Sequence, residues 1–120
     1  MDARLREGIG LFNAGRFFEC HEALEALYLE TDDANKPFLE GLVQLAAALR
    51  IFTDFGEIKG PVRMVRQALI RFENYQPAFM QVAVAELSAS LEAWAKATEA
   101  GGATSPPIPK IQLQGFSLFS

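Results

Sequence analysis

Three residue types are scarce in this chain of 120 residues, which contains one His, one Cys and one Trp. A single Cys excludes an internal disulfide, and a single His excludes a metal site built from two or three histidines of one chain. Basic residues are also in the minority, with 11 Lys and Arg against 15 Asp and Glu and a net charge of −4. We therefore expect no nucleic acid to bind through charge alone.

Long hydrophobic runs and targeting signals are lacking as well. Residues 1–7 are charged and do not form the apolar run of a signal peptide. The most hydrophobic window, residues 38–55, contains Glu40, Gln44 and Arg50, which makes it too polar for a bilayer and favours a buried helix. We expect a cytoplasmic protein that does not enter a membrane.

Apolar side chains at helical spacing are what the chain has in quantity, since half of its residues are hydrophobic. This period predicts an all-α fold of about five helices in a compact orthogonal or superhelical array. Asp2 is the expected N-cap of the first helix. The next three helices are expected at about residues 16–30, 36–54 and 60–72, and a fifth carries Met80, Val84, Leu87, Leu91 and Trp94 on one stripe.

The chain divides into a helical domain, residues 1–100, and a linker with an apolar tail, residues 101–120. Gly and Pro are concentrated in residues 101–107, which predicts a linker without helix. The tail beyond it is too apolar to float free. We expect it to be extended and docked on its own domain or on a neighbouring subunit, which would make a homo-oligomer.

The predicted second helix carries the single His on its apolar side. At about 100° per residue, His21 falls about 40° from Phe17 and Glu25 about 80° from it, so both polar side chains lie within the apolar arc. Buried ionisable groups are costly unless they pair, and the i,i+4 spacing lets these two meet. We expect His21 and Glu25 to form a pair within the helical core.

Two interpretations of this pair stay open. In the first, it is the centre of a small-ligand or hydrolytic acid–base site, in which His21 moves the proton and Glu25 fixes its tautomer. In the second, the pair is a structural clasp in a non-enzymatic interaction or dimerisation module. The sequence leaves open whether the protein is an enzyme.

Further side chains complete the expected site. Glu40 and Gln44, one turn apart on the third helix, are expected to meet His21 and Glu25 across a helix interface. The full set of expected ligand-binding residues is Phe17, Phe18, Glu22, Tyr28, Glu40 and Gln44.

A metal site is the less favoured interpretation of these residues. His21-Glu22-x-x-Glu25 is half of a zincin motif and lacks the second His. Cys20 points about 100° away from His21. A metal would have to use His21, Glu25 and Glu40 with waters, or groups from two subunits. We expect no metal and no cofactor.

The predicted fourth helix has a basic side. Lys59, Arg63 and Arg66 fall opposite its apolar residues. This pattern is typical of the solvated face of an amphipathic helix rather than of a phosphate site.

Residues 12–25 (FNAGRFFECHEALE) and 38–44 (FLEGLVQ) form two recognisable blocks. They resemble the signature of a small bacterial and archaeal family called domain of unknown function 309, whose hallmark is a His-x-x-x-Glu-x-x-Trp motif on a helix. The motif falls on His21 and Glu25, with Tyr28 at the Trp position. The resemblance implies an all-helical fold and no established activity.

Overall fold

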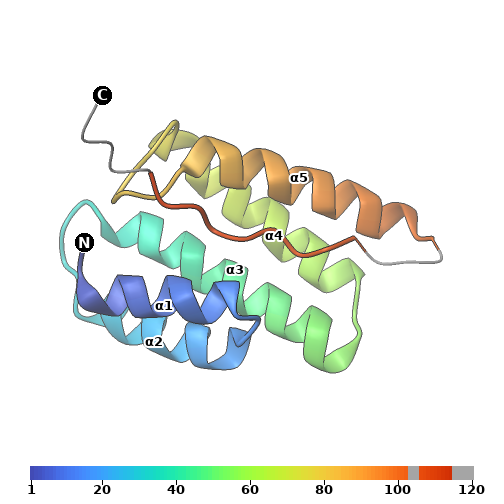
Figure 1. The fold of residues 1–120 in the computed structure, drawn as a ribbon, viewed down its shortest axis with the longest axis horizontal. Helices are drawn as coiled ribbons and strands as arrows, with labels where there is room; N and C mark the ends of the chain where they lie inside the picture. Colours follow the sequence, from blue (N-terminus) through green and yellow to red (C-terminus); the bar gives the residue numbers. More distant parts are fainter. Residues whose placement is uncertain (103–105, 115–120) are drawn as a thin grey trace.

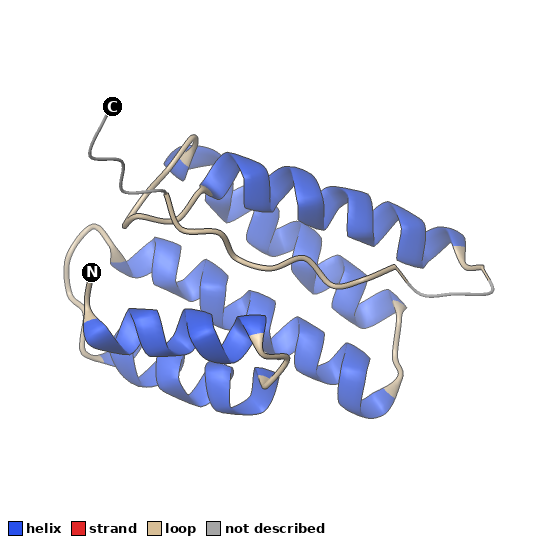
Figure 2. Ribbon diagram, viewed as in Figure 1, coloured by secondary structure: helices blue, strands red, loops and turns tan. Residues whose placement is uncertain are grey.

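Five α-helices follow one another in the computed structural model, which describes residues 1–102 and 106–114. They are α1 (Ala3–Asn13), α2 (Phe17–Leu29), α3 (Lys36–Phe55), α4 (Lys59–Phe72) and α5 (Val84–Ala100), with a short 3₁₀ helix, η1 (Glu73–Tyr75), after α4. The described residues contain no strand, so the expected all-α class is confirmed (Figure 2).

Local signals in the sequence set the ends of these helices. The side chain of Asp2 accepts a hydrogen bond of 2.7 Å from the backbone N–H of Arg4, so Asp2 caps α1 as predicted. Pro37 lies in the first turn of α3, where its missing N–H costs nothing. Gly56 ends α3 with a φ of 69°, a left-handed conformation that glycine adopts without strain.

Each helix packs against the next one along the chain, and α3 lies at the centre of this array between α2 and α4 (Figure 1). Leu42, Leu45 and Leu49 of α3 are fully buried. A helix that is apolar nearly all round is expected at the middle of an array, and α3 is that helix.

Aromatic rings fill the core where α3 and α4 meet the loop before α5. The ring of Phe38 lies 5.5 Å from that of Phe72, 5.3 Å from Tyr75 and 5.1 Å from Phe79, measured between centroids. Gly41 makes this packing possible, because a Cβ at this position would lie 2.7 Å from Cε1 of Phe72. The α3–α4 interface therefore requires close contact at this glycine.

The tail crosses the helical array between α1 and α5 in an extended conformation (Figure 1). Asn13 fixes it twice: its side chain donates to the carbonyl of Ile111 and accepts from the N–H of Ile111, at 2.9 and 2.7 Å. The side chain of Ile111 is buried in the core. Residues 106–114 thus dock on their own chain. Phe116, Leu118 and Phe119, the most apolar part of the predicted tail, lie outside the described residues.

One expectation about the fifth helix is wrong. Met80 does not belong to α5, which begins at Val84. Met80 and Gln81 have φ values of 48° and 66°, and the turn that they form is closed by hydrogen bonds between the backbones of Phe79 and Val82. The spacing of Met80 matches the apolar stripe of α5, but the left-handed turn at Met80 and Gln81 prevents the helix from extending back to Met80.

In the part of the chain that the structure describes, no helix combines the length and apolar character needed to cross a membrane.

Candidate ligand-binding site

The core side of α2 is formed by its aromatic and aliphatic residues. Phe17 is buried and packs edge-on against Phe12 of α1, with ring centroids 5.2 Å apart. Cys20 and Leu24 are fully buried on the same helix. Phe17 is therefore a core residue that holds α2 in place and does not line a surface that a ligand reaches.

His21 and Glu25 meet one turn apart, as their spacing predicts. Nε2 of His21 lies 3.6 Å from Oε2 of Glu25, which is too long for a hydrogen bond and within reach of an ion pair when the imidazole is protonated. The pair is not in the core, however, because the two side chains are 29% and 51% exposed. The expected burial is wrong, since α1 and α3 cover only part of the apolar arc of α2.

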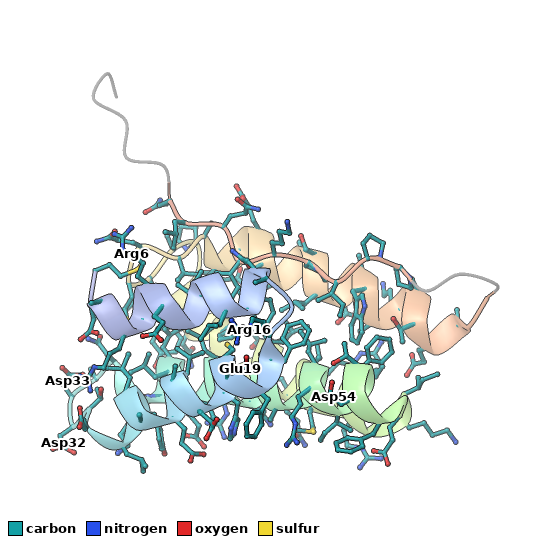
Figure 3. All side chains as sticks on the ribbon, turned by 60° about the horizontal axis from the view of Figure 1, so that its bottom comes forward. Arg6, Arg16, Glu19, Asp32, Asp33 and Asp54 are labelled. Carbon is teal, nitrogen blue, oxygen red and sulfur yellow. The ribbon has the colours of Figure 1, made fainter. Side chains whose placement is uncertain are left out.

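Phe18 lies on the same side of α2 as His21 and is 43% exposed. The guanidinium of Arg50, from α3, is stacked over its ring, 4.5 Å from the centroid. The same guanidinium lies 5.5 Å from the ring of Phe55, and its Nε lies 3.5 Å from Oδ2 of Asp54. Figure 3 labels Asp54 on α3, and Asp54 is the next-to-last residue of this helix. Phe18 is thus a surface aromatic held by a cation–π contact.

Tyr28 and Glu22 have different surroundings. The ring of Tyr28 is half-buried, and Nζ of Lys36 lies over it, 4.6 Å from the centroid. Glu22 is exposed on α2. Tyr28, near the end of α2, therefore contacts the first residue of α3, while Glu22 faces solvent.

Glu40 and Gln44 contact α4 instead of α2. Oε1 of Glu40 lies 3.0 Å from Nη2 of Arg71. The amide Nε2 of Gln44 donates to Oε1 of Gln67 at 2.9 Å. Among the described residues, no hydrogen bond or ion pair joins Glu40 or Gln44 to His21 or Glu25. The expectation that the two pairs meet directly across one helix interface is wrong, because Glu40 and Gln44 lie at the border of α3 with α4, whereas His21 and Glu25 lie on α2.

The borders of α3 with α2 and with α4 nevertheless belong to one surface, which we call the α3 stripe. At about 100° per residue, its members fall on one side of α3, and each is partly exposed. Arg50 borders α2 through Phe18, and Gln44 borders α4 through Gln67. A shallow hollow lies over the α4 border, lined by Gln44, Gln67, Ile70 and Arg71. The stripe consists of Glu40, Val43, Gln44, Ala47 and Arg50.

One polar atom of the α3 stripe, the acceptor Oε1 of Gln44, is shielded from solvent and lacks a hydrogen-bond partner. Nε of Arg50 also makes no hydrogen bond, but it faces Oδ2 of Asp54 in an ion pair. Buried polar atoms in proteins are nearly always paired, so the unpaired oxygen of Gln44 calls for an explanation. A ligand that offers a hydrogen-bond donor would satisfy this oxygen.

Sequence reasoning missed Arg50, Gln67 and Arg71 as members of this surface. Arg50 stands out in the sequence as a cation within the most apolar helix. Gln67 and Arg71 carry no such signal, because the sequence does not show which side of α4 contacts α3.

Candidate metal ligands do not cluster in the described residues, and the single thiol is buried. Within residues 1–102 and 106–114, no three His, Cys, Asp or Glu side chains gather closely enough to hold a metal ion. Glu40, a member of the metal set considered above, is paired with Arg71. Burial raises the pKa of the Cys20 thiol to about 12, so this side chain stays a neutral core residue at ordinary pH.

A comparison with known families shows to which family the chain belongs. The family model described as domain of unknown function (DUF309) matches residues 5–64, half of the chain. The chain belongs to this family. The match covers α1 to α3 and the start of α4, and therefore includes His21, Glu25 and the whole α3 stripe. No curated protein shows a significant match to the chain.

Proposed function

We propose that this DUF309 protein binds a small polar ligand on the α3 stripe. On α2, His21 and Glu25 follow Phe18, whose ring contacts Arg50 of the stripe, and on α4, Gln67 and Arg71 contact Gln44 and Glu40 of the stripe. The proposal depends above all on the unpaired, solvent-shielded Oε1 of Gln44. It predicts a ligand with a hydrogen-bond donor, such as a primary amide or a hydroxyl group.

The placement of polar residues on α3 supports this proposal. An unpaired buried polar atom costs about 1–3 kcal/mol, and the unpaired Oε1 of Gln44 lies on the partly exposed side of the helix. A core helix gains nothing in stability from such an atom. A ligand that pairs with it regains this free energy on binding.

Binding is better supported than catalysis. Acid–base and electrostatic catalysis depend on a preorganised site from which water is largely excluded, whereas His21 and Glu25 are open to solvent. In a catalytic form of the proposal, His21 would move the proton and Glu25 would orient the imidazole.

A structural clasp is also less well supported. Exposed ion pairs contribute about 0–1 kcal/mol to stability, and Glu25 is half-exposed. The dimerisation module and the cytoplasmic location stay predictions.

A titration by NMR tests the proposal. Asparagine, nicotinamide, glycerol and acetate are each added at millimolar concentration to labelled protein. We expect at least one donor-bearing compound to shift the backbone resonances of α3 and the imidazole resonances of His21. Acetate, which lacks a donor when ionised, serves as the chemical control.

Two variants and a control complete this experiment. Gln44→Met removes the acceptor at similar size and should weaken binding about tenfold. His21→Gln should also weaken it, while Glu22→Gln, on the exposed side of α2, should leave it unchanged. The proposal is wrong when no compound shifts the α3 resonances, or when the Gln44 and His21 variants bind as tightly as the parent protein.

A further inference from the structure

A second surface, the α4 groove, runs along the exposed side of α4, next to the α3 stripe. It has a volume of about 630 Å³, a size typical of small-molecule sites. It faces α5 through Glu99 and adjoins the shallow hollow only at Gln67 and Ile70. Its lining residues are Ile58, Lys59, Val62, Arg63, Arg66, Gln67, Ile70 and Glu99.

The groove has an apolar floor that the fold leaves open. Ile58, which directly precedes α4, lies in one row with Val62 and Ile70, and Arg66 stands between the last two. The row is about 18 Å long from Ile58 to Ile70. Ile58 and Ile70 are among the exposed large hydrophobic residues, and Ile70 is 64% exposed. Exposed aliphatic side chains in one hollow are a common feature of ligand or partner surfaces.

Basic side chains stand along the same groove. Arg66 is held in place by Glu99 at 2.9 Å and by Glu92 at 3.7 Å. The hydrogen bond to Glu99 raises the pKa of Arg66, which therefore stays charged. Within the described part of the chain, no carboxylate pairs with Lys59 or Arg63. Two cations are thus available to an incoming anion.

The charge of the groove contrasts with the charge of the whole chain. The groove is lined by three bases and one carboxylate, on a protein whose net charge is −4. A second copy docked by the same face would bring like charges together, because a two-fold interface sets each patch against itself. The aliphatic floor is of no use to a nucleic acid, whose main contacts are charged and polar.

We infer that the α4 groove binds a small amphiphilic anion, namely an aliphatic chain that ends in a carboxylate. The chain would lie along Ile58, Val62 and Ile70. The carboxylate would bind Arg63 and Lys59 through charge-assisted hydrogen bonds. This site is separate from the polar ligand site on the α3 stripe, and each can fail without the other.

Decanoate, kept below its micelle concentration, is the probe. Added to labelled full-length protein, it should shift the backbone resonances of α4 and the facing turn of α5, and leave those of α2 unchanged. Octanoate should bind more weakly, by roughly fourfold for each methylene that is buried. Decyltrimethylammonium has the same kind of tail and the opposite charge, and we expect it to leave the groove empty.

Exposed positions provide variants that should not disturb folding. Arg63→Gln should weaken decanoate binding about tenfold, while Arg6→Gln, at an exposed base of α1, should have no effect. Ile70→Ser should weaken binding as well, with Leu29→Ser as its control, because Leu29 is similarly exposed, at 65%, on α2.

Several results would overturn this inference. Equal binding of decanoate and decyltrimethylammonium would show nonspecific adsorption of the tail. Unchanged decanoate affinity in both the Arg63 and the Ile70 variants would place the ligand elsewhere. A shift of the α4 resonances with protein concentration alone would show that a second copy covers this face.

Discussion

The inner and outer sides of α3 differ in composition and in exposure. On the inner side, Leu42, Leu45 and Leu49 are fully buried and Gly41 admits the ring of Phe72. On the outer side, the α3 stripe carries polar side chains that are partly exposed, one of which, Gln44, keeps an unpaired atom. The comparison indicates that the inner side stabilises the fold, whereas the outer side carries the residues to which we assign the proposed ligand site.

The largest difference in the free energy of unfolding should come from replacing Phe38, on the inner side of α3, and Phe18 of α2, which contacts Arg50 on the outer side. Phe38→Ala empties the centre of the aromatic cluster and should lower the free energy of unfolding by about 3–5 kcal/mol. Phe18→Ala, at a half-exposed ring on the outer side, should cost about 1 kcal/mol, the value of a cation–π contact. Urea denaturation measures both, and equal losses would contradict the division between the two sides.

The pH dependence of the free energy of unfolding tests whether the thiol of Cys20 is buried in the core. Its pKa is raised to about 12 in the folded protein by burial, against an ordinary value of 9.0. Between these values the unfolded chain loses a proton that the folded chain keeps, so stability should fall as pH rises, by about 1.4 kcal/mol per pH unit. Cys20→Ala should remove this part of the slope in denaturation curves recorded from pH 8 to 11. An unchanged slope would mean that the thiol is not buried.

Two glycines should respond in opposite directions to the same substitution. Gly41→Ala brings a Cβ within 2.7 Å of the Phe72 ring and should cost about 1–3 kcal/mol. Gly10→Ala, in α1, meets no atom within 4 Å and should gain about 0.5–1 kcal/mol from helix propensity. Thermal unfolding should therefore shift down in one variant and up in the other. Two shifts of the same sign would disprove the close contact at Gly41.

Local chemistry made most of the helices predictable. Asp2, Pro37 and Gly56 act through their own backbone and side-chain preferences, which the sequence displays directly. The prediction that the fifth helix includes Met80 is wrong because the spacing of Met80 fits the helix, while its left-handed φ depends on the pairing of Phe79 with Val82. Periodicity describes a helix surface and does not show where a turn interrupts it.

The candidate site was predictable only in part, since contacts between helices are not encoded in a single helix. The spacing of His21 and Glu25 correctly predicts that they meet, but not that α1 and α3 leave them exposed. Glu40 and Gln44 lie on the same side of α3 as Arg50, which contacts α2, yet their own partners come from α4. The spacing of about 100° per residue gives the direction of each side chain around one helix axis. Which neighbour lies in that direction depends on the tertiary fold.

The smallest expected effect tests the central claim, that His21 and Glu25 belong to a recognition surface and do not hold the fold together. His21→Ala and Glu25→Ala should each change the free energy of unfolding by less than about 1 kcal/mol, as for an exposed ion pair. Glu22→Ala, on the exposed side of the same helix, is the matched control.

Urea denaturation of these three variants is the decisive measurement. Three curves that nearly coincide with the parent curve are the predicted result. A loss of about 3 kcal/mol or more in both the His21 and the Glu25 variants, with the Glu22 control unchanged, would contradict the account, because a loss of that size is typical of a buried pair that has lost one partner.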